Sequence, residues 1–222
     1  MTHLLISEWV LILIWGALGG FGGTIVLAGL IALLESLFTP AEATSIAIFG
    51  SRTAGKTTLW DQLRGEFKNR NYIATSGAVS ISEFTIEYKG VKKTIKKTAD
   101  FSGDNEMVKR YNELIEAGTF IYYLIDLTEL NKYKKETRSR LQKISHIVRE
   151  KNLNDKAGCR LIGTHYREYY NKTGKSRDEA RRELIEVIGL NNIKDANIED
   201  SILILELTES ADINFVLDQI IN

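Results

Sequence analysis

The chain has one cysteine, one proline and no net charge, and each scarcity narrows what the protein can be. Cys159 has no second cysteine to pair with, so an internal disulfide is excluded and a reducing compartment fits. We expect this thiol to be buried and unreactive, because no neighbouring residue would activate it. A formal net charge of zero over 222 residues gives no reason to expect a nucleic-acid partner.

No lysine or arginine precedes Arg52, and residues 9–34 carry no charge of either sign. As a helix this run would be about 39 Å long at 1.5 Å per residue, more than the roughly 30 Å hydrocarbon core of a bilayer. A secretory signal would need a basic start and a shorter apolar core. A buried globular helix is rarely apolar on every face. We therefore expect residues 1–38 to be a membrane segment that spans the bilayer through residues 9–34.

The glycines of this segment allow either a single membrane-spanning helix or a re-entrant hairpin. Overlapping G-x-x-x-G pairs at residues 16–23 would allow two helices to approach closely, whereas the same stretch, GALGGFGG, could break the helix into a re-entrant hairpin. Pro40, the only proline, ends any continuing helix, so residues 39–44 are expected to form a linker. Flanking charges are too sparse to orient the span by the positive-inside rule.

The sequence GSRTAGKT follows the apolar run 45–49 and fits the phosphate-loop spacing G-x-x-x-x-G-K-[ST]. Backbone N–H groups of such a turn wrap phosphates, and the following helix presents its positive N-terminus to them. Lys56 is expected to reach the β- and γ-phosphates, and the Thr57 hydroxyl to bind Mg²⁺. A strand signal before the motif and a helix signal after it favour this reading over a turn with a chance lysine. The expected phosphate-loop residues are Gly50, Ser51, Arg52, Thr53, Ala54, Gly55, Lys56, Thr57 and Thr58.

Strand and helix signals alternate from residue 45 to the end of the chain. The runs FIYYLI and ILILEL are continuously apolar, as strands covered on both faces are. EFTIEYKGVKKTIKK indicates a hairpin with an edge marked by lysines. This order predicts an α/β P-loop NTPase fold with a doubly wound, mostly parallel sheet of six strands. The expected strands are 45–49, 79–88, 91–99, 120–125, 160–163 and 201–207, and the expected helices are 57–68, 105–116, 132–151, 177–188 and 213–221.

A second motif, DFSG, places Asp100 and Gly103 in D-x-x-G spacing at the end of the third expected strand. A nucleotide switch needs a carboxylate linked to Mg²⁺ at a strand end, followed by an amide within reach of the γ-phosphate. Alone, the spacing usually marks a turn. One hairpin after a phosphate loop, it indicates a nucleoside triphosphate site.

With these motifs, residues 45–222 resemble the Ras-like small GTPase superfamily. GSRTAGKT matches its first motif and DFSG its third. LIGTHYRE is similar to the T-H-x-D variant of the base-reading motif in Roc-type GTPases, with Thr164 and His165 in place of Asn-Lys. ELTES resembles the S-A-K motif that backs the guanine, through Thr208 and Glu209. The resemblance implies bound GTP or GDP, Mg²⁺, GTP hydrolysis, and a protein effector or regulator.

The N-terminal anchor before such a domain is similar in architecture to the beta-subunit family of the signal recognition particle receptor. This likeness implies a single-pass membrane protein whose GTPase domain faces the cytosol, where the nucleotide is. It also implies a nucleotide-dependent switch or assembly subunit at the membrane.

Several positions depart from the superfamily pattern. Arg167 stands where the guanine-reading Asp is expected, and an arginine can only donate hydrogen bonds. Either Glu168, one position later, takes over, or base specificity is relaxed or lost. Asp104 replaces the water-positioning Gln, which predicts slow hydrolysis. Arg52 could act as an arginine finger in cis, obstruct a finger supplied by a partner, or be a solvated loop residue. The expected catalytic residues are thus Lys56, Asp104 and Arg52, and the expected Mg²⁺ ligands are Thr57, Asp100 and Thr75.

Two other functions stay open on the sequence. A P-loop ATPase or kinase would need a separate base-reading or acceptor site, and no such motif is evident. A pseudo-GTPase that binds nucleotide weakly and acts as a scaffold is kept open by Arg167 and Asp104.

Overall fold

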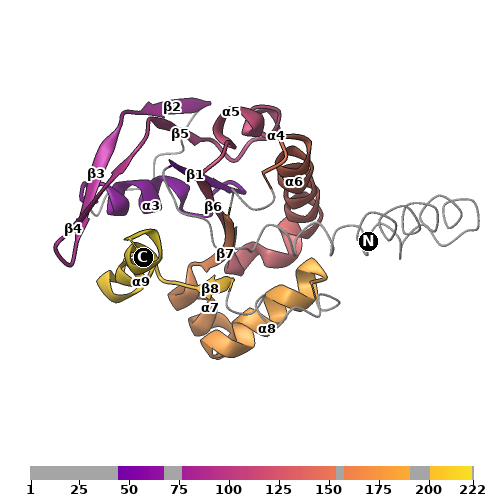
Figure 1. Ribbon diagram of the computed structural model, residues 1–222. Helices are drawn as coiled ribbons and strands as arrows, with labels where there is room; N and C mark the ends of the chain where they lie inside the picture. Colours follow the sequence, from indigo (N-terminus) through magenta and orange to yellow (C-terminus); the bar gives the residue numbers. More distant parts are fainter. Residues whose placement is uncertain (1–44, 68–76, 154–157, 191–200, 222) are drawn as a thin grey trace, which may run out of the picture.

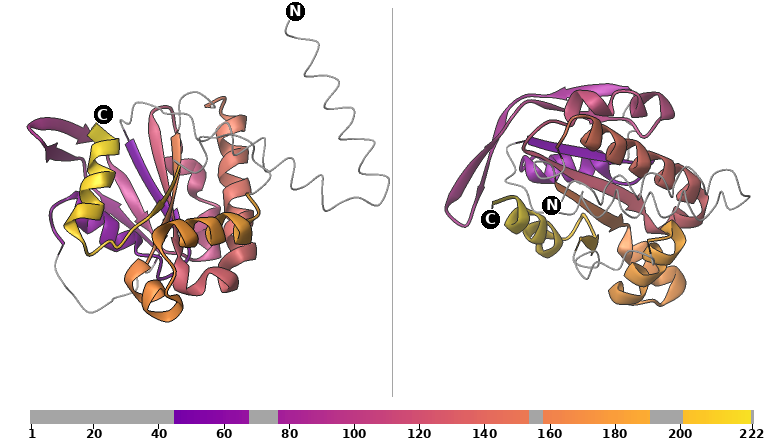
Figure 2. Two further views of the ribbon diagram at one scale, coloured as in Figure 1. Left: turned by 90° about the horizontal axis from the view of Figure 1, so that it is seen from below. Right: turned by 45° about the vertical axis from the view of Figure 1, so that its right-hand side comes forward.

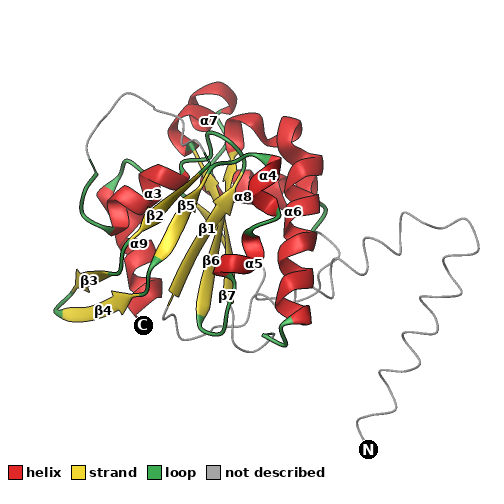
Figure 3. Cartoon of the chain, turned by 90° about the horizontal axis from the view of Figure 1, so that it is seen from above, coloured by secondary structure: helices red, strands yellow, loops and turns green. Residues whose placement is uncertain are grey.

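The computed structural model describes residues 45–67, 77–153, 158–190 and 201–221, and its centre is a parallel sheet. Four strands are hydrogen-bonded in the order β1-β6-β7-β8. Helices cover both faces of this sheet (Figure 1; Figure 3). The prediction of an α/β fold around a parallel sheet is confirmed. The strands are β1 (Ser45–Gly50), β6 (Thr119–Asp126), β7 (Gly158–Thr164) and β8 (Ile202–Ile204).

The central strands are buried on both faces, which explains their continuous apolar runs. Every residue of β6 is buried. Along β1, Ala47 and Phe49 pack into one core cluster, whereas Ile46 and Ile48 pack into another on the opposite face. The first cluster lies against α4 (Asn105–Val108), α5 (Tyr111–Leu114), α6 (Leu130–Glu150) and α8 (Arg177–Ile188); the second lies against α3 (Lys56–Leu63) and α9 (Ser210–Ile221).

A long antiparallel hairpin follows α3. Its four segments share one register, with Ala78 opposite Phe101 at one end and Tyr88 opposite Val91 at the turn. The pairing is interrupted at residues 82–83 and 96–97, which divides the hairpin into two short ladders. The segments are β2 (Ala78–Ile81), β3 (Phe84–Tyr88), β4 (Val91–Ile95) and β5 (Thr98–Phe101).

The predicted six-stranded sheet is wrong for the described residues, because the hairpin forms ladders of its own beside the four-stranded sheet. Its inner end stays close to β1, where the Thr98 hydroxyl donates to the Ile46 carbonyl at 2.9 Å. Its outer end bends away towards α9 (Figure 2). There Lys89 pairs with Asp218 at 2.7 Å. The break in the ladder lets the hairpin follow α9 instead of the sheet.

Several element boundaries differ from the predicted ones. The helix expected over 105–116 is divided into α4 and α5, and α3 ends at Leu63. Strand β8 is shorter than expected, although the Leu205 N–H still bonds the Gly163 carbonyl at 2.8 Å. An unpredicted helix, α7 (Tyr166–Thr173), begins inside the expected base-reading motif and ends at Gly174 in the left-handed conformation.

Cys159 lies in β7 with no exposed surface. Burial raises the pKa of its thiol to about 12, so the thiol stays protonated near neutral pH. The prediction that this cysteine is buried is confirmed.

In the part of the chain that the structure describes, no helix is both long enough and apolar enough to cross a bilayer. The predicted membrane segment 1–38, with its span 9–34, and the linker 39–44 lie outside the described residues. So does Thr75, the expected third Mg²⁺ ligand.

Candidate nucleotide site

The candidate site lies at the carboxyl edge of the parallel sheet. The phosphate loop follows β1, and the expected base-reading residues follow β7 and β8. Asp126 ends β6 between them. Open α/β sheets bind ligands in the loops beyond the carboxyl ends of their strands. The sequence motifs are therefore brought together where such a fold places its ligand.

The phosphate loop has a backbone that requires glycine at its first position. Gly50 has φ 144°, and a Cβ there would lie 2.3 Å from the Leu124 carbonyl oxygen. Thr53 and Gly55 are in the left-handed region, with φ 63° and 85°. Helix α3 starts directly after this turn, so its N-terminal N–H groups adjoin the loop. This is the local geometry of an anion-binding turn.

Lys56, the first residue of α3, is folded back over the loop. Its Nζ donates to the Ser51 carbonyl at 2.7 Å, and only 7 % of the residue is exposed. Burial lowers the pKa of this ammonium to about 8, and the nearby Asp100 carboxylate offsets only part of that effect. A desolvated cation at this point gains stability from an anionic ligand.

This lowered pKa predicts that nucleotide affinity falls as the pH rises above about 8. A phosphate beside Lys56 favours its charged form, so binding above that pH must take up a proton. Affinity should be flat below about pH 7.5 and then fall by up to about tenfold per pH unit. Calorimetry at pH 7, 8 and 9 in buffers of different ionisation enthalpy measures both affinity and proton uptake. The variant Lys56→Arg should show no such fall, and a flat profile for the unmodified chain would contradict the placement of Lys56.

Thr57 and Asp100 form a pair suited to Mg²⁺. The Thr57 Oγ1 donates to the Asp100 Oδ2 at 2.6 Å, and Asp100 is 4 % exposed. Hydroxyl and carboxylate oxygens fit this ion, which is usually held by one or two protein groups together with phosphates and water. The described ranges contain no cluster of three or more His, Cys, Asp or Glu residues suited to a metal. The pair therefore fits a Mg²⁺ held jointly with a nucleotide.

Gly103 of the D-x-x-G motif presses against the phosphate loop. A Cβ on Gly103 would lie 2.2 Å from the backbone nitrogen of Arg52 and 2.5 Å from the carbonyl carbon of Ser51. Both neighbours are backbone atoms, which cannot turn aside as a flexible side chain can. The two motifs predicted to contact phosphate are in direct contact with each other.

The expected catalytic residues Arg52 and Asp104 form an ion pair across this contact. Arg52 Nε lies 3.4 Å from Asp104 Oδ1, with both side chains well exposed. Ser102 Oγ also donates to Asp104 Oδ2 at 3.0 Å. An exposed pair of this kind contributes little to stability, about 0–1 kcal/mol. In this arrangement the Arg52 side chain points towards the D-x-x-G segment.

Arg140, on α6, links the phosphate loop to the D-x-x-G segment. This residue was not predicted from the sequence as part of the site. It is 2 % exposed and donates to the Gly50 carbonyl at 3.0 Å and to the Gly103 carbonyl at 2.8 Å. It also donates to Asn105 Oδ1 at 3.1 Å and pairs with Glu136 at 2.9 Å. One buried guanidinium therefore bridges the phosphate loop and the D-x-x-G segment.

A signal for Arg140 does exist in the sequence. The buried stripe of α6 includes Leu141, Ile144, Ile147 and Val148, and Arg140 is one helical turn before Ile144 on the same face. A charged residue within an apolar stripe needs a buried polar partner. That rule identifies Arg140 as unusual but cannot name its partners.

Thr164 and His165, at the end of β7, both contact the phosphate loop. Thr164 Oγ1 donates to the Ala54 carbonyl at 3.1 Å. His165 has φ 58°, and its Nε2 lies 2.8 Å from the Thr53 carbonyl, an acceptor that requires the proton on Nε2. Both predicted base-motif residues thus pack on the turn that is expected to hold phosphate.

Arg167 and Glu168, the two residues at or next to the expected guanine-reading position, both form ion pairs. The Arg167 guanidinium pairs with Glu209 at 2.8 Å. Glu168 pairs with Lys172 at 2.8 Å, one turn along α7, with both side chains 58 % exposed. The hypothesis that Glu168 supplies the missing carboxylate therefore finds no support in the geometry. A different carboxylate, Glu206, accepts the Arg167 backbone N–H at 3.1 Å.

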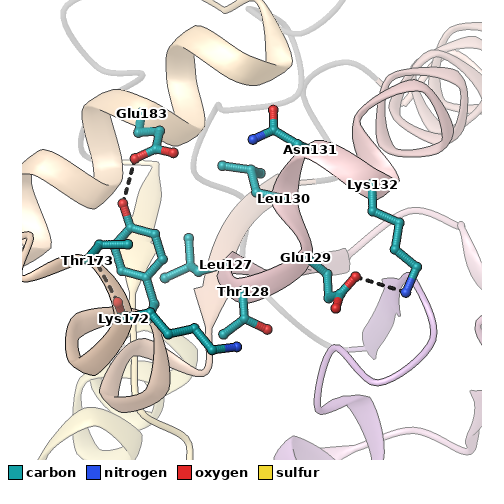
Figure 4. A pocket seen from close by; sticks show the side chains of 10 residues that line it. Leu127, Thr128, Glu129, Leu130, Asn131, Lys132, Lys172, Thr173 and Glu183 are labelled. Carbon is teal, nitrogen blue, oxygen red and sulfur yellow. Dashed lines mark hydrogen bonds and ion pairs between the residues drawn. The ribbon is translucent and has the colours of Figure 1, made fainter.

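A separate pocket of about 360 Å³ lies between the start of α6 and helices α7 and α8 (Figure 4). Charged groups that line it already have partners: Lys132 pairs with Glu129 at 2.8 Å, and the Tyr169 hydroxyl donates to Glu183 at 2.6 Å. No residue of the phosphate loop or of the D-x-x-G segment lines this pocket. It is distinct from the candidate nucleotide site. Its lining residues are Leu127, Thr128 and Glu129 of η1 (Leu127–Glu129), Leu130, Asn131 and Lys132 of α6, Tyr169, Lys172 and Thr173 of α7, and Glu183 of α8.

Neither protein-family models nor curated proteins match this chain. Its family is therefore not shown by comparison, and its function has to be inferred from the site itself.

Proposed function

We propose that this chain is a membrane-anchored, Ras-like GTP-binding protein that acts as a nucleotide-dependent switch or assembly subunit. One observation carries the proposal: Lys56, the Thr57–Asp100 pair and Gly103 converge on a single glycine-dependent turn. Residues 9–34 are its proposed anchor, and the nucleotide-binding domain faces the cytosol. A protein effector or regulator is its proposed partner.

In this proposal each group has a defined task towards a bound nucleotide. The loop N–H groups and the Lys56 ammonium hold the β- and γ-phosphates. Thr57 and Asp100 would hold Mg²⁺, which neutralises charge on the phosphates when it is bound. Gly103, whose backbone lies against the loop at Arg52, would contact the γ-phosphate of a bound nucleotide. A group that enters this contact would displace the D-x-x-G segment, which is how a switch senses its nucleotide.

The guanine base is favoured over adenine by the charges beyond the loop. Guanine presents two neighbouring donors, its N1–H and its 2-amino group, and needs an acceptor such as a carboxylate. Two carboxylates contact Arg167: Glu206 accepts its backbone N–H, and Glu209 pairs with its guanidinium. Adenine would place its unprotonated ring nitrogen against the same negative groups. The rival function of a P-loop ATPase is therefore the weaker proposal.

Identification of the nucleotide that co-purifies with the detergent-extracted full chain tests this function. We expect GDP or GTP, released on denaturation and identified by ion-pair chromatography. Adenine nucleotide in its place would support the ATPase. No bound nucleotide, together with no binding of added guanine nucleotide, would support the pseudo-GTPase scaffold.

Hydrolysis in the absence of a partner is expected to be slow, and two variants separate the causes. Asp104→Gln should raise the single-turnover rate, because an amide can orient water where a carboxylate adds negative charge. Arg52→Gly should change intrinsic turnover by less than about threefold, since the exposed Arg52 side chain points towards Asp104. A cis arginine finger would instead cost about 10³–10⁵ in rate on this change. Fast hydrolysis by the unmodified chain would contradict the slow switch.

A further inference from the structure

We propose that Glu206 reads the base, supplying from the loop after β8 the carboxylate that position 167 lacks. The inference rests on the proposed binding of a guanine nucleotide and adds the residue that selects the base. Glu206 lies two residues beyond β8, in the loop before α9.

The carboxylate of Glu206 is fixed beside the backbone of the base motif. Its Oε2 accepts the Arg167 backbone N–H at 3.1 Å, and its Oε1 accepts the Thr208 hydroxyl at 2.8 Å. The Glu206 backbone N–H donates to Asp212 Oδ2 at 2.6 Å. Asp212 in turn pairs with Arg177 at 2.8 Å. Both the backbone and the side chain of Glu206 are thus held in one orientation, at the position where the sequence pattern lacks its acceptor.

This loop also touches the phosphate-binding turn. The next residue, Leu207, packs so closely on Gly55 that a Cβ there would lie 2.7 Å from the leucine Cδ1. The Leu207 carbonyl accepts from Gln62 of α3 at 2.8 Å. Thr164 and His165 contact the same turn from β7. A nucleotide with its phosphates in the turn would extend its base along these two loops, where Glu206 lies.

The remaining hydrogen-bonding capacity of Glu206 matches guanine. An ionised carboxylate has about four acceptor positions. Two of them are used by the contacts to Arg167 and Thr208, and Glu206 is half-buried rather than enclosed. Guanine offers two adjacent donors to such a group. Other carboxylates nearby are paired with cations: Glu209 with Arg167, Glu168 with Lys172 and Asp212 with Arg177.

The test compares nucleotide preference in the full chain and in Glu206→Gln. Calorimetry with Mg²⁺ measures the affinities for GDP, XDP (xanthosine diphosphate) and ADP. Xanthine carries a carbonyl where guanine carries the 2-amino group, so a glutamine amide N–H suits xanthine and opposes guanine. We expect the variant to lose about 10- to 100-fold in GDP affinity, the effect of one lost charge-assisted hydrogen bond, and to gain in XDP affinity. The control Glu168→Gln, whose carboxylate pairs with Lys172, should keep the GDP-to-XDP ratio of the unmodified chain, and Glu209→Gln tests the competing assignment of the base-reading carboxylate.

A purely structural role for Glu206 would weaken all nucleotides alike and leave that ratio unchanged, which would overturn the inference. A ratio that moves in Glu209→Gln instead would do the same. A second measurement needs no variant: IDP (inosine diphosphate), which lacks the 2-amino group, should bind the unmodified chain about tenfold more weakly than GDP. If the unmodified chain prefers GDP and Glu206→Gln has the same GDP-to-XDP ratio, the role of Glu206 is overturned while the proposed function stands. Binding of no nucleotide by the unmodified chain would overturn the proposed function together with it.

Discussion

Replacing Lys56 with alanine is expected to abolish nucleotide binding, with at least about a hundredfold loss of affinity. The buried Nζ lies over the phosphate loop, so the change would remove its charge-assisted hydrogen bonds to the phosphates of a bound nucleotide, each contributing about 1.5–3 kcal/mol. Arg52 cannot replace it, because its guanidinium is exposed and paired with Asp104. Calorimetric titration of GDP with Mg²⁺ measures the loss.

The matched control for this variant is Lys92→Ala. Lys92 lies on β4 and pairs with Glu87 at 3.2 Å on the surface, and its side chain is 67 % exposed. It should bind GDP as tightly as the unmodified chain. Unchanged GDP affinity in Lys56→Ala would remove the assignment of the phosphate loop.

The largest loss of stability is expected for Arg140→Met. This change leaves Glu136 without its buried cation and leaves the Gly50 and Gly103 carbonyls without their donor. Each buried carbonyl left without a donor costs about 1–3 kcal/mol in the free energy of unfolding, whereas Glu136, whose side chain is 27 % exposed, adds less. Arg140→Lys should recover only part of this loss, because an ammonium cannot span both carbonyls as the planar guanidinium does. Urea unfolding of the two variants measures both losses.

Arg138→Met separates this local effect from a general effect of removing an arginine. Arg138 lies on the same helix and also donates to two backbone carbonyls, those of Ile188 at 2.7 Å and Val187 at 3.0 Å, far from the phosphate loop in the sequence. It should lower stability without changing GDP affinity of the folded chain. Arg140→Lys should lower both. Equal GDP affinity in Arg140→Lys and the unmodified chain would show that Arg140 does not position the loop.

The parts of the site that the sequence predicted are those determined by local spacing. Gly50, Lys56 and Thr57 lie within one turn, and that turn needs a glycine at a position where a Cβ would strike the Leu124 carbonyl. Asp100 and Gly103 were predicted from the D-x-x-G spacing that follows the hairpin, and Asp100 lies in β5, the last strand of that hairpin. Buried strands such as β6 can also be predicted, because a strand covered on both faces has a continuous apolar sequence.

The parts that the sequence did not predict depend on contacts between distant elements. Arg140 meets Gly50 and Gly103 only because α6 packs beside both loops. Glu206 approaches Arg167 only because β7 and β8 are neighbours in the sheet. The hairpin itself was predicted, but its departure from β1 towards α9 depends on pairs such as Lys89 with Asp218. The spacing of residues along the chain does not predict these contacts between distant elements.

Titration of GDP and of ADP, each with Mg²⁺, into the detergent-solubilised full chain tests the central claim most directly. The account predicts saturable binding of one GDP per chain, with ADP bound at least about a hundredfold more weakly. Equal or tighter binding of ADP, or no binding of either nucleotide, would contradict it.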